Sequence, residues 1–170
     1  MAWKFKKQDF QEEAVNSVCE IFEGQQKGIF KHQLGLSGKL DDFGYKNEQL
    51  TLTSDTILKR IREVQRKNKL HESKQLEGDG INLTIEMETG TGKTYTYVNT
   101  IYELNKRYGW SKFVIIVPSI AIREGVYNSL QLMQDNFASI YGKKSKFFIF
   151  DASKSNQIED FARSSSINIM

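Results

Sequence analysis

The chain has 170 residues, and its 24 Lys and Arg against 21 Asp and Glu leave a net charge of only +3. Such a small charge does not by itself indicate a nucleic-acid partner, and the 39% hydrophobic content excludes a disordered chain. The single cysteine, Cys19, excludes an internal disulfide and favours the reducing cytoplasm. No apolar run approaches the roughly 20 residues of a membrane span, so we expect one cytoplasmic domain and no membrane partner.

Residues 8–23 are predicted to form a helix that ends at Gly24. One face of this helix is apolar, formed by Phe10, Ala14, Val15, Val18, Ile21 and Phe22. Gln11 lies in the middle of that face, where an amide needs a hydrogen-bond partner. Two interpretations stay open: a bond to a nearby backbone group, or pairing of the amide donor and acceptor with adenine.

An excursion at about residues 25–80 separates this helix from the next motif. Residues 25–53 are polar and broken by Gly28, Gly35, Gly38 and Gly44, which predicts an insertion with its own packing and a short strand at 49–53. Residues 54–70 predict a helix capped by Ser54 or Asp55, with an apolar stripe of Ile57, Leu58, Ile61 and Val64. The other face of this helix is basic. We interpret it mainly as a solvated surface, with DNA binding as the alternative.

The chain is organised around residues 87–94. The alternating run 81–85 predicts a strand, and Val98, Ile101 and Leu104 predict a helix on the other side of the glycines. Gly90 and Gly92 allow backbone N–H groups to approach phosphate oxygens closely. Lys93 can reach the β- and γ-phosphates, and the Thr94 hydroxyl can ligate Mg²⁺. The segment therefore predicts a P-loop, although Met87 replaces the glycine that opens the generic pattern.

The C-terminal half alternates between strands and helices. Residues 112–117 and 147–150 predict strands buried on both faces, and 167–170 begin a further strand. Ser119 is placed to cap a helix that ends at Gly142, with Val126, Leu130, Met133 and Phe137 on its apolar face. A short helix is predicted at 157–162. This alternation predicts an α/β domain with a parallel sheet whose ligand lies at the carboxyl ends of the strands.

Three motifs together resemble a known family. Residues 9–15 resemble the Q motif of superfamily-two helicase-like ATPases, and residues 86–95 resemble their motif I in its type III restriction enzyme form. Residues 117–126, Val-Pro-Ser-Ile-Ala-Ile-Arg-Glu-Gly-Val, look like motif Ia of the same family. The combination resembles the restriction (Res) subunit of type III restriction-modification systems.

The resemblance implies the first lobe of a RecA-like P-loop NTPase fold within an ATP-dependent, site-specific DNA endonuclease. Its cofactors would be ATP and Mg²⁺, and its partners double-stranded DNA and a methyltransferase (Mod) subunit. Gln11 would contact adenine, and Pro118, Ser119 and Arg123 would face the DNA backbone. The phosphates would lie against Thr89, Gly90, Thr91, Gly92, Lys93 and Thr94, with Thr94 also binding Mg²⁺.

The main departure from that family is length, because the sequence shows no second lobe, arginine finger or nuclease carboxylate cluster. The sequence also contains no Walker B Asp-Glu pair, and Asp151 is the acidic residue that directly follows a late strand. We therefore expect residues 1–170 to be the N-terminal part of a larger subunit, inactive alone and prone to associate through an exposed strand at 167–170. The alternatives are the first lobe of another translocase, such as a type I restriction motor or a helicase, and a stand-alone nucleotide-binding module. A small-molecule P-loop kinase is a more distant one.

Overall fold

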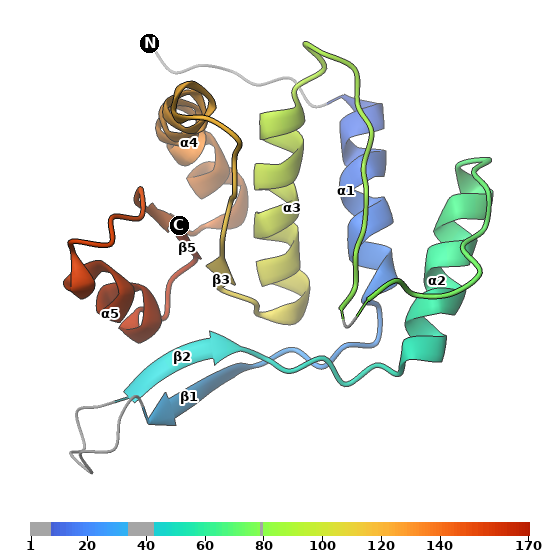
Figure 1. Cartoon of the computed structure of the whole chain (residues 1–170), viewed down its shortest axis with the longest axis horizontal. Helices are drawn as coiled ribbons and strands as arrows, with labels where there is room; N and C mark the ends of the chain where they lie inside the picture. Colours follow the sequence, from blue (N-terminus) through green and yellow to red (C-terminus); the bar gives the residue numbers. More distant parts are fainter. Residues whose placement is uncertain (1–7, 34–42, 79) are drawn as a thin grey trace. The chain divides into compact units, whose positions relative to one another are not determined.

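The computed structural model describes residues 8–33, 43–78 and 80–170 (Figure 1). The chain divides into two compact units. The helical unit contains residues 8–26 and 49–103, and the sheet unit contains residues 27–48 and 104–170, each apart from the undescribed positions. Gly35 and Gly38, two of the predicted breaks, lie outside the described residues. None of the helices in the described ranges is both long and apolar enough to span a membrane.

In the helical unit, α1 (Asp9–Ile21) packs against α2 (Ser54–Lys67). Val15 and Cys19 of α1 and Ile57 and Ile61 of α2 are buried, which confirms the predicted apolar faces. Phe10 was expected on the buried face of α1 but is 48% exposed. It lies in the first turn of α1, where no described element covers it, so this part of the prediction is wrong.

Thr53 caps α2, rather than Ser54 or Asp55 as predicted. Its hydroxyl oxygen accepts a hydrogen bond from the backbone N–H of Thr56 at 3.3 Å. The helix therefore begins one residue earlier than the cap assignment required. A cap is read from sequence only to within a residue or two when several capping residues are adjacent.

Residues 49–53 do not form the predicted strand. The buried side chain of Gln25 takes the place of a neighbouring strand. Its amide N–H donates to Gln49 O at 2.9 Å, and its oxygen accepts from Thr51 N at 2.9 Å. One side chain therefore satisfies backbone groups that a ladder would otherwise pair.

The segment 81–88 leads into α3 (Lys93–Tyr108) as an extended trace (Figure 1). Ile81 and Leu83 are half-buried and Ile85 is 43% exposed, so the predicted alternation is only partly present. No strand is assigned here because no described segment forms a ladder with it. The helix after it is confirmed: Val98 and Ile101 are buried, and Gly109 ends α3 with φ +76°.

The sheet unit contains a three-stranded parallel sheet in the order β3 (Lys112–Phe113), β5 (Asn168–Ile169), β4 (Lys146–Phe147). Asn168 is in register with both Lys112 and Lys146. The predicted α/β class with a parallel sheet is confirmed. The expectation that 167–170 form an exposed strand is wrong, because β5 is the central strand and Ile167 and Ile169 are 2% and 1% exposed. The proposed route to self-association through this strand therefore fails.

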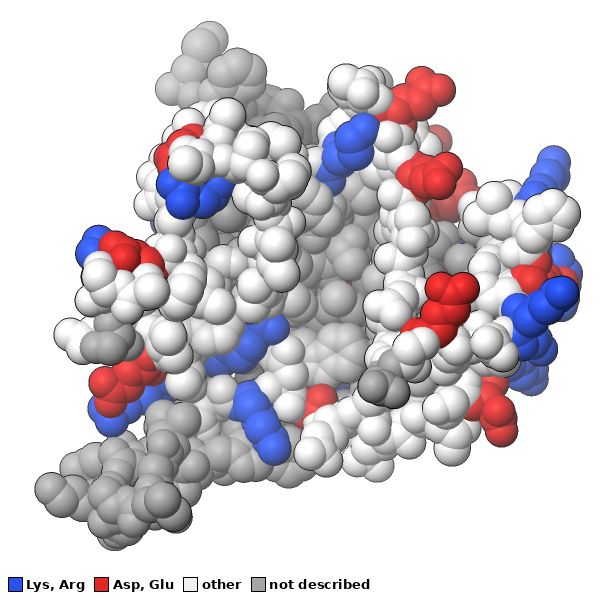
Figure 2. Space-filling view, viewed as in Figure 1, with Lys and Arg blue, Asp and Glu red and all other residues white. Residues whose placement is uncertain are grey.

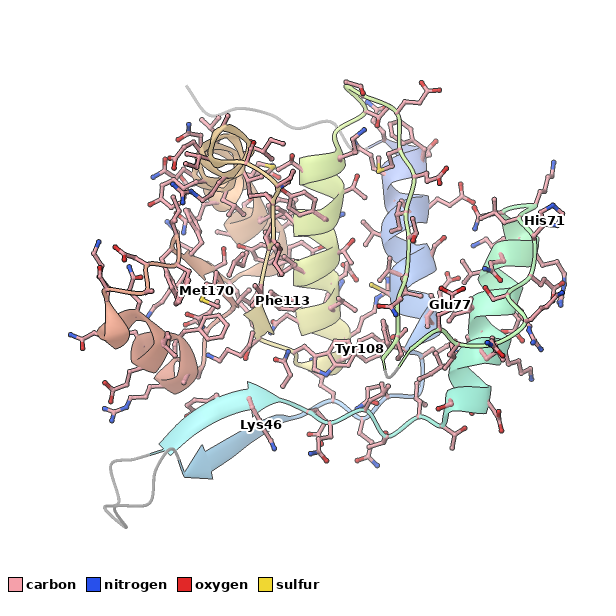
Figure 3. All side chains as sticks on the ribbon, viewed as in Figure 1. Lys46, His71, Glu77, Tyr108, Phe113 and Met170 are labelled. Carbon is pink, nitrogen blue, oxygen red and sulfur yellow. The ribbon has the colours of Figure 1, made fainter. Side chains whose placement is uncertain are left out.

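The predicted strands at 112–117 and 147–150 are shorter and less buried than expected. Beyond β3 a single ladder bond continues, from Ile115 N to Met170 O at 2.8 Å, while Val114 and Ile116 are 56% and 90% exposed. Phe150 is 48% exposed. Figure 3 labels Phe113 and Met170 on neighbouring segments, where Met170 N donates to Phe113 O. An uninterrupted apolar run predicts burial on both faces, but only one face is covered here.

Two helices and a hairpin complete the sheet unit. In α4 (Ile120–Tyr141), the Ser119 hydroxyl accepts from Ile122 N and Gly142 ends the helix with φ +67°, as predicted. The predicted short helix is α5 (Ser155–Arg163). The described part of residues 25–53 contains an antiparallel hairpin of β1 (Ile29–Gln33) and β2 (Phe43–Asn47). Asn47 anchors the hairpin, because its amide oxygen accepts from Ser111 N and Lys112 N.

Candidate nucleotide-binding site

A tight turn opens the glycine-rich loop of the helical unit. The backbone N–H and the hydroxyl of Thr91 both point to Glu88 O, the hydroxyl at 2.6 Å. Gly90 is the third residue of this turn and has φ +82°. A turn with a left-handed third residue requires glycine in practice, because a Cβ is strained there. No atom lies within 4 Å of the place a Cβ would take at Gly90, so the loop surface is open here.

Gly92 lies against the one polar residue of the apolar face of α1. Its φ is +85°, and a Cβ at this position would lie 2.5 Å from Gln11 Nε2. The Gln11 amide donates to Thr91 O at 2.8 Å, and the Gln11 side chain is 9% exposed. The prediction that Gln11 needs a partner is confirmed, and that partner is the backbone of the loop itself. Among the described residues, no donor pairs with the Gln11 amide oxygen.

The first turn of α3 is the positive end of the helix dipole, and it lies next to the loop. Thr96 N donates to Gly92 O at 3.0 Å, so Gly92 stands at the start of the helix. The backbone N–H groups of a first turn have no helical acceptor, and no acidic residue occupies this turn. Lys93 is exposed and donates to Met87 O at 2.6 Å. Its ammonium group therefore lies over the loop, and Met87 contributes a carbonyl that a glycine would also have supplied.

Thr94 and Tyr97 lie on one side of α3. Both are partly exposed, but the Tyr97 hydroxyl oxygen is buried and has no hydrogen-bond partner among the described residues. Burial raises the pKa of Tyr97, and the nearby Thr94 hydroxyl partly offsets that rise. Tyr97 was missed from sequence. The signal that could have found it is its position three residues after Thr94, which places the two on neighbouring turns.

The predicted DNA-facing residues belong to the sheet unit. Pro118 is exposed and ends the extended segment after β3. The Ser119 hydroxyl is engaged in capping α4, and the Arg123 guanidinium pairs with Glu124 at 3.0 Å. Arg123 is 43% exposed in its side chain, so an ion pair with an adjacent residue can exchange for a phosphate at little cost.

The basic face of α2 is largely occupied by contacts within the helical unit. Arg62 donates to the backbone carbonyls of Ser73 and Lys74, both at 2.8 Å, and Arg66 forms a two-pronged pair with Glu72 at 3.0 Å. These arginines hold the loop after α2, on which His71 and Glu77 lie (Figure 3). Blue and red groups alternate over α2 in Figure 2. The face is therefore a mixed-charge surface, which agrees with the solvated interpretation.

Asp151 does not point to a catalytic role. Its carboxylate accepts from the Ser153 hydroxyl at 2.6 Å and from Ser153 N at 3.0 Å. These bonds hold the pKa of Asp151 below its ordinary value. The carboxylate closes a turn ahead of α5. No group of three or more His, Cys, Asp or Glu in the described ranges could hold a metal ion.

Comparison with known proteins assigns the family. The model of the family described as type III restriction enzyme, res subunit, matches residues 48–169. The chain belongs to this family. It is 34% identical to the EcoPI Res subunit of Escherichia phage P1 and 33% identical to the EcoP15I Res subunit of Escherichia coli, over 72% of this chain in each case. It is 43% identical to the StyLTI Res subunit of Salmonella typhimurium strain LT2 over 40% of this chain and 7% of that protein.

The chain spans 14% of the length of the EcoPI and EcoP15I Res subunits. The resemblance to type III Res subunits that the three motifs carry is thereby confirmed. The matched range includes the loop and α3, the 118–123 segment and all three strands of the parallel sheet. Gln11 lies before this range, so its place in the site depends on its contact with Thr91.

Proposed function

We propose that this chain is the ATP-binding part of the first RecA-like lobe of a type III restriction subunit. The observation that carries the proposal is the loop at 88–94. Four features come together in this loop. It has two glycines with left-handed φ and an open surface at Gly90. A lysine lies over it, and the helix that follows starts without acidic residues. Each of these features favours an anion, and together they match a triphosphate.

Each residue has a distinct role in this proposal. The loop from Thr89 to Gly92 surrounds the phosphates with backbone N–H groups, and Lys93 exchanges Met87 O for phosphate oxygens. Thr94 supplies a hydroxyl ligand for Mg²⁺, which would neutralise charge on the phosphates when bound. The open space at Gly90 fits a phosphate, because a side chain there would fill it. The Gln11 amide N–H holds the loop through its bond to Thr91 O, and its amide oxygen is available to accept a hydrogen bond from adenine.

The activity of the whole subunit is part of the same proposal. Within a type III restriction enzyme, this lobe would couple ATP hydrolysis to action on double-stranded DNA and would work beside a Mod subunit. Pro118, Ser119 and Arg123 would contact the DNA backbone. Family membership and the exposure of this segment support these roles.

A binding titration tests the proposal. We expect Mg²⁺-ATP to bind, measured by calorimetry, and Lys93→Ala to weaken the affinity about 30-fold, because one charge-assisted contact contributes about 2 kcal/mol. Lys106→Ala, at the other end of α3, is the matched control and should leave the affinity unchanged. Equal affinities for wild type and Lys93→Ala would rule out the proposed site.

A further inference from the structure

Tyr97 is a partly exposed residue beside the proposed Mg²⁺ ligand, but its hydroxyl oxygen is buried. It lies three residues after Thr94 in α3. Side chains in an α-helix lean toward the N-terminus, so a long side chain at i+3 covers the residue one turn before it. The Tyr97 hydroxyl is thereby directed at the Thr94 end of the helix.

The state of the Tyr97 hydroxyl is unusual for a buried polar group. Its oxygen is buried, yet no described residue hydrogen-bonds to it. Buried hydroxyl groups are nearly always paired, and an exception needs an explanation. The Thr94 hydroxyl is close enough to affect the pKa of Tyr97, although the pair falls short of hydrogen-bond geometry in this structure.

The chemistry of a hydroxyl ligand supplies a reason. A threonine that ligates Mg²⁺ uses an oxygen lone pair, so its O–H group points away from the metal and needs another atom to accept its hydrogen bond. A phenol is neutral at physiological pH, and its oxygen can accept one hydrogen bond. Among the described residues, no other side chain pairs with the Thr94 hydroxyl.

We propose that Tyr97 is a positioning residue for Mg²⁺-nucleotide binding, whose hydroxyl oxygen accepts a hydrogen bond from the Thr94 hydroxyl and so orients the Thr94 oxygen toward the metal. This inference rests on the proposed function. Tyr97 itself touches neither metal nor nucleotide. Its effect is therefore confined to the part of the affinity that depends on Mg²⁺.

The test compares nucleotide affinity with Mg²⁺ and with EDTA, using a fluorescent ATP analogue. Wild type should bind more tightly with Mg²⁺. In Tyr97→Phe the Mg²⁺ enhancement should be about fivefold smaller than in wild type, which is the effect of one neutral hydrogen bond. The affinity of this variant in EDTA should equal that of wild type. Tyr95→Phe is the matched control, because Tyr95 is a buried tyrosine of α3 that also has a raised pKa. It should keep the full enhancement.

A second variant guards against an indirect effect. Thr94→Val should abolish the Mg²⁺ enhancement, and adding Tyr97→Phe to it should cause no further loss if the two act through one bond. An undiminished enhancement in Tyr97→Phe would overturn the inference, and so would an equal loss with Mg²⁺ and EDTA, which would mean a packing role. Failure of wild type to bind nucleotide at all would instead remove the proposed function, and this inference with it.

Discussion

Replacement of Gly92 by alanine should destabilise the chain more than the same change at Gly90. Both glycines have nearly the same left-handed φ, +85° and +82°, so alanine should cost about 1–2 kcal/mol of backbone strain at either position. Only at Gly92 does the new Cβ meet an atom, Gln11 Nε2 at 2.5 Å. Gly90→Ala is therefore a control for strain alone.

The additional cost at Gly92 can be worked out from the contact it breaks. The end of a glutamine side chain is flexible, but Gln11 is 9% exposed and donates to Thr91 O at 2.8 Å. Moving it aside breaks that bond and leaves a buried group unpaired, which costs about 1–3 kcal/mol. We expect Gly90→Ala to cost about 1–2 kcal/mol in the free energy of unfolding and Gly92→Ala about 2–5 kcal/mol.

Urea denaturation of a double-mutant cycle measures the difference. In a Gln11→Ala background the clash is gone, so the cost of Gly92→Ala should fall to that of Gly90→Ala. The coupling energy between positions 11 and 92 should be about 1–3 kcal/mol. Additive effects at these two positions would refute the reasoning, since they would mean that Gln11 does not constrain Gly92.

Three further predictions concern charge and base choice. Burial, with the charge of Lys146 second, lowers the pKa of Lys112 from 10.5 to about 8, so the folded state releases this proton before the unfolded state does. The Lys112 contribution to stability should therefore rise between about pH 8 and pH 10.5. Over this range, the melting temperature of wild type should increase relative to that of Lys112→Met. Arg123→Ala should weaken duplex DNA binding and lower the slope of log affinity against log salt by about 1, measured by fluorescence anisotropy, whereas Lys144→Ala should not; an unchanged slope would exclude a phosphate contact. Gln11→Ala should reduce the preference for ATP over GTP in calorimetry if its amide oxygen reads adenine, and an unchanged ratio would leave it only the role of holding the loop.

Local signals in the sequence were sufficient to predict where the helices lie, although not every cap or buried position. Ser119 and Gly142 each act within a few residues of themselves, and they begin and end α4 where predicted. Strands depend on partners that can lie far away in the chain. The central place of β5 follows from pairing with segments about 22 and 56 residues earlier, and the extent of β3 depends on which face the fold covers.

The same division applies to the candidate site. The glycines, Lys93 and Thr94 are contiguous, and their spacing alone predicts a phosphate-binding loop. The position of Gln11 on an apolar face predicts that it has a partner, but the partner is 80 residues away and no periodicity identifies it. Tyr97 was missed for another reason: it repeats at helical spacing among apolar neighbours, where a tyrosine is most simply interpreted as part of the core.

The contact between Gln11 and Thr91 also has a consequence for the direction of the loop. In a trans peptide, the carbonyl of one residue and the N–H of the next point in opposite directions. Because the Gln11 amide donates to Thr91 O and holds that carbonyl toward α1, the N–H of Gly92 must point away from α1. That N–H belongs to the start of α3, where an anion would receive it. The exposed Lys93 ammonium can exchange its hydrogen bond to Met87 O for one to a phosphate. The Gln11 side chain is buried, so we expect it to stay in place. The loop is therefore held on the side that faces α1, so in the proposed site its backbone donors would already be oriented before a nucleotide bound, and binding would require less ordering.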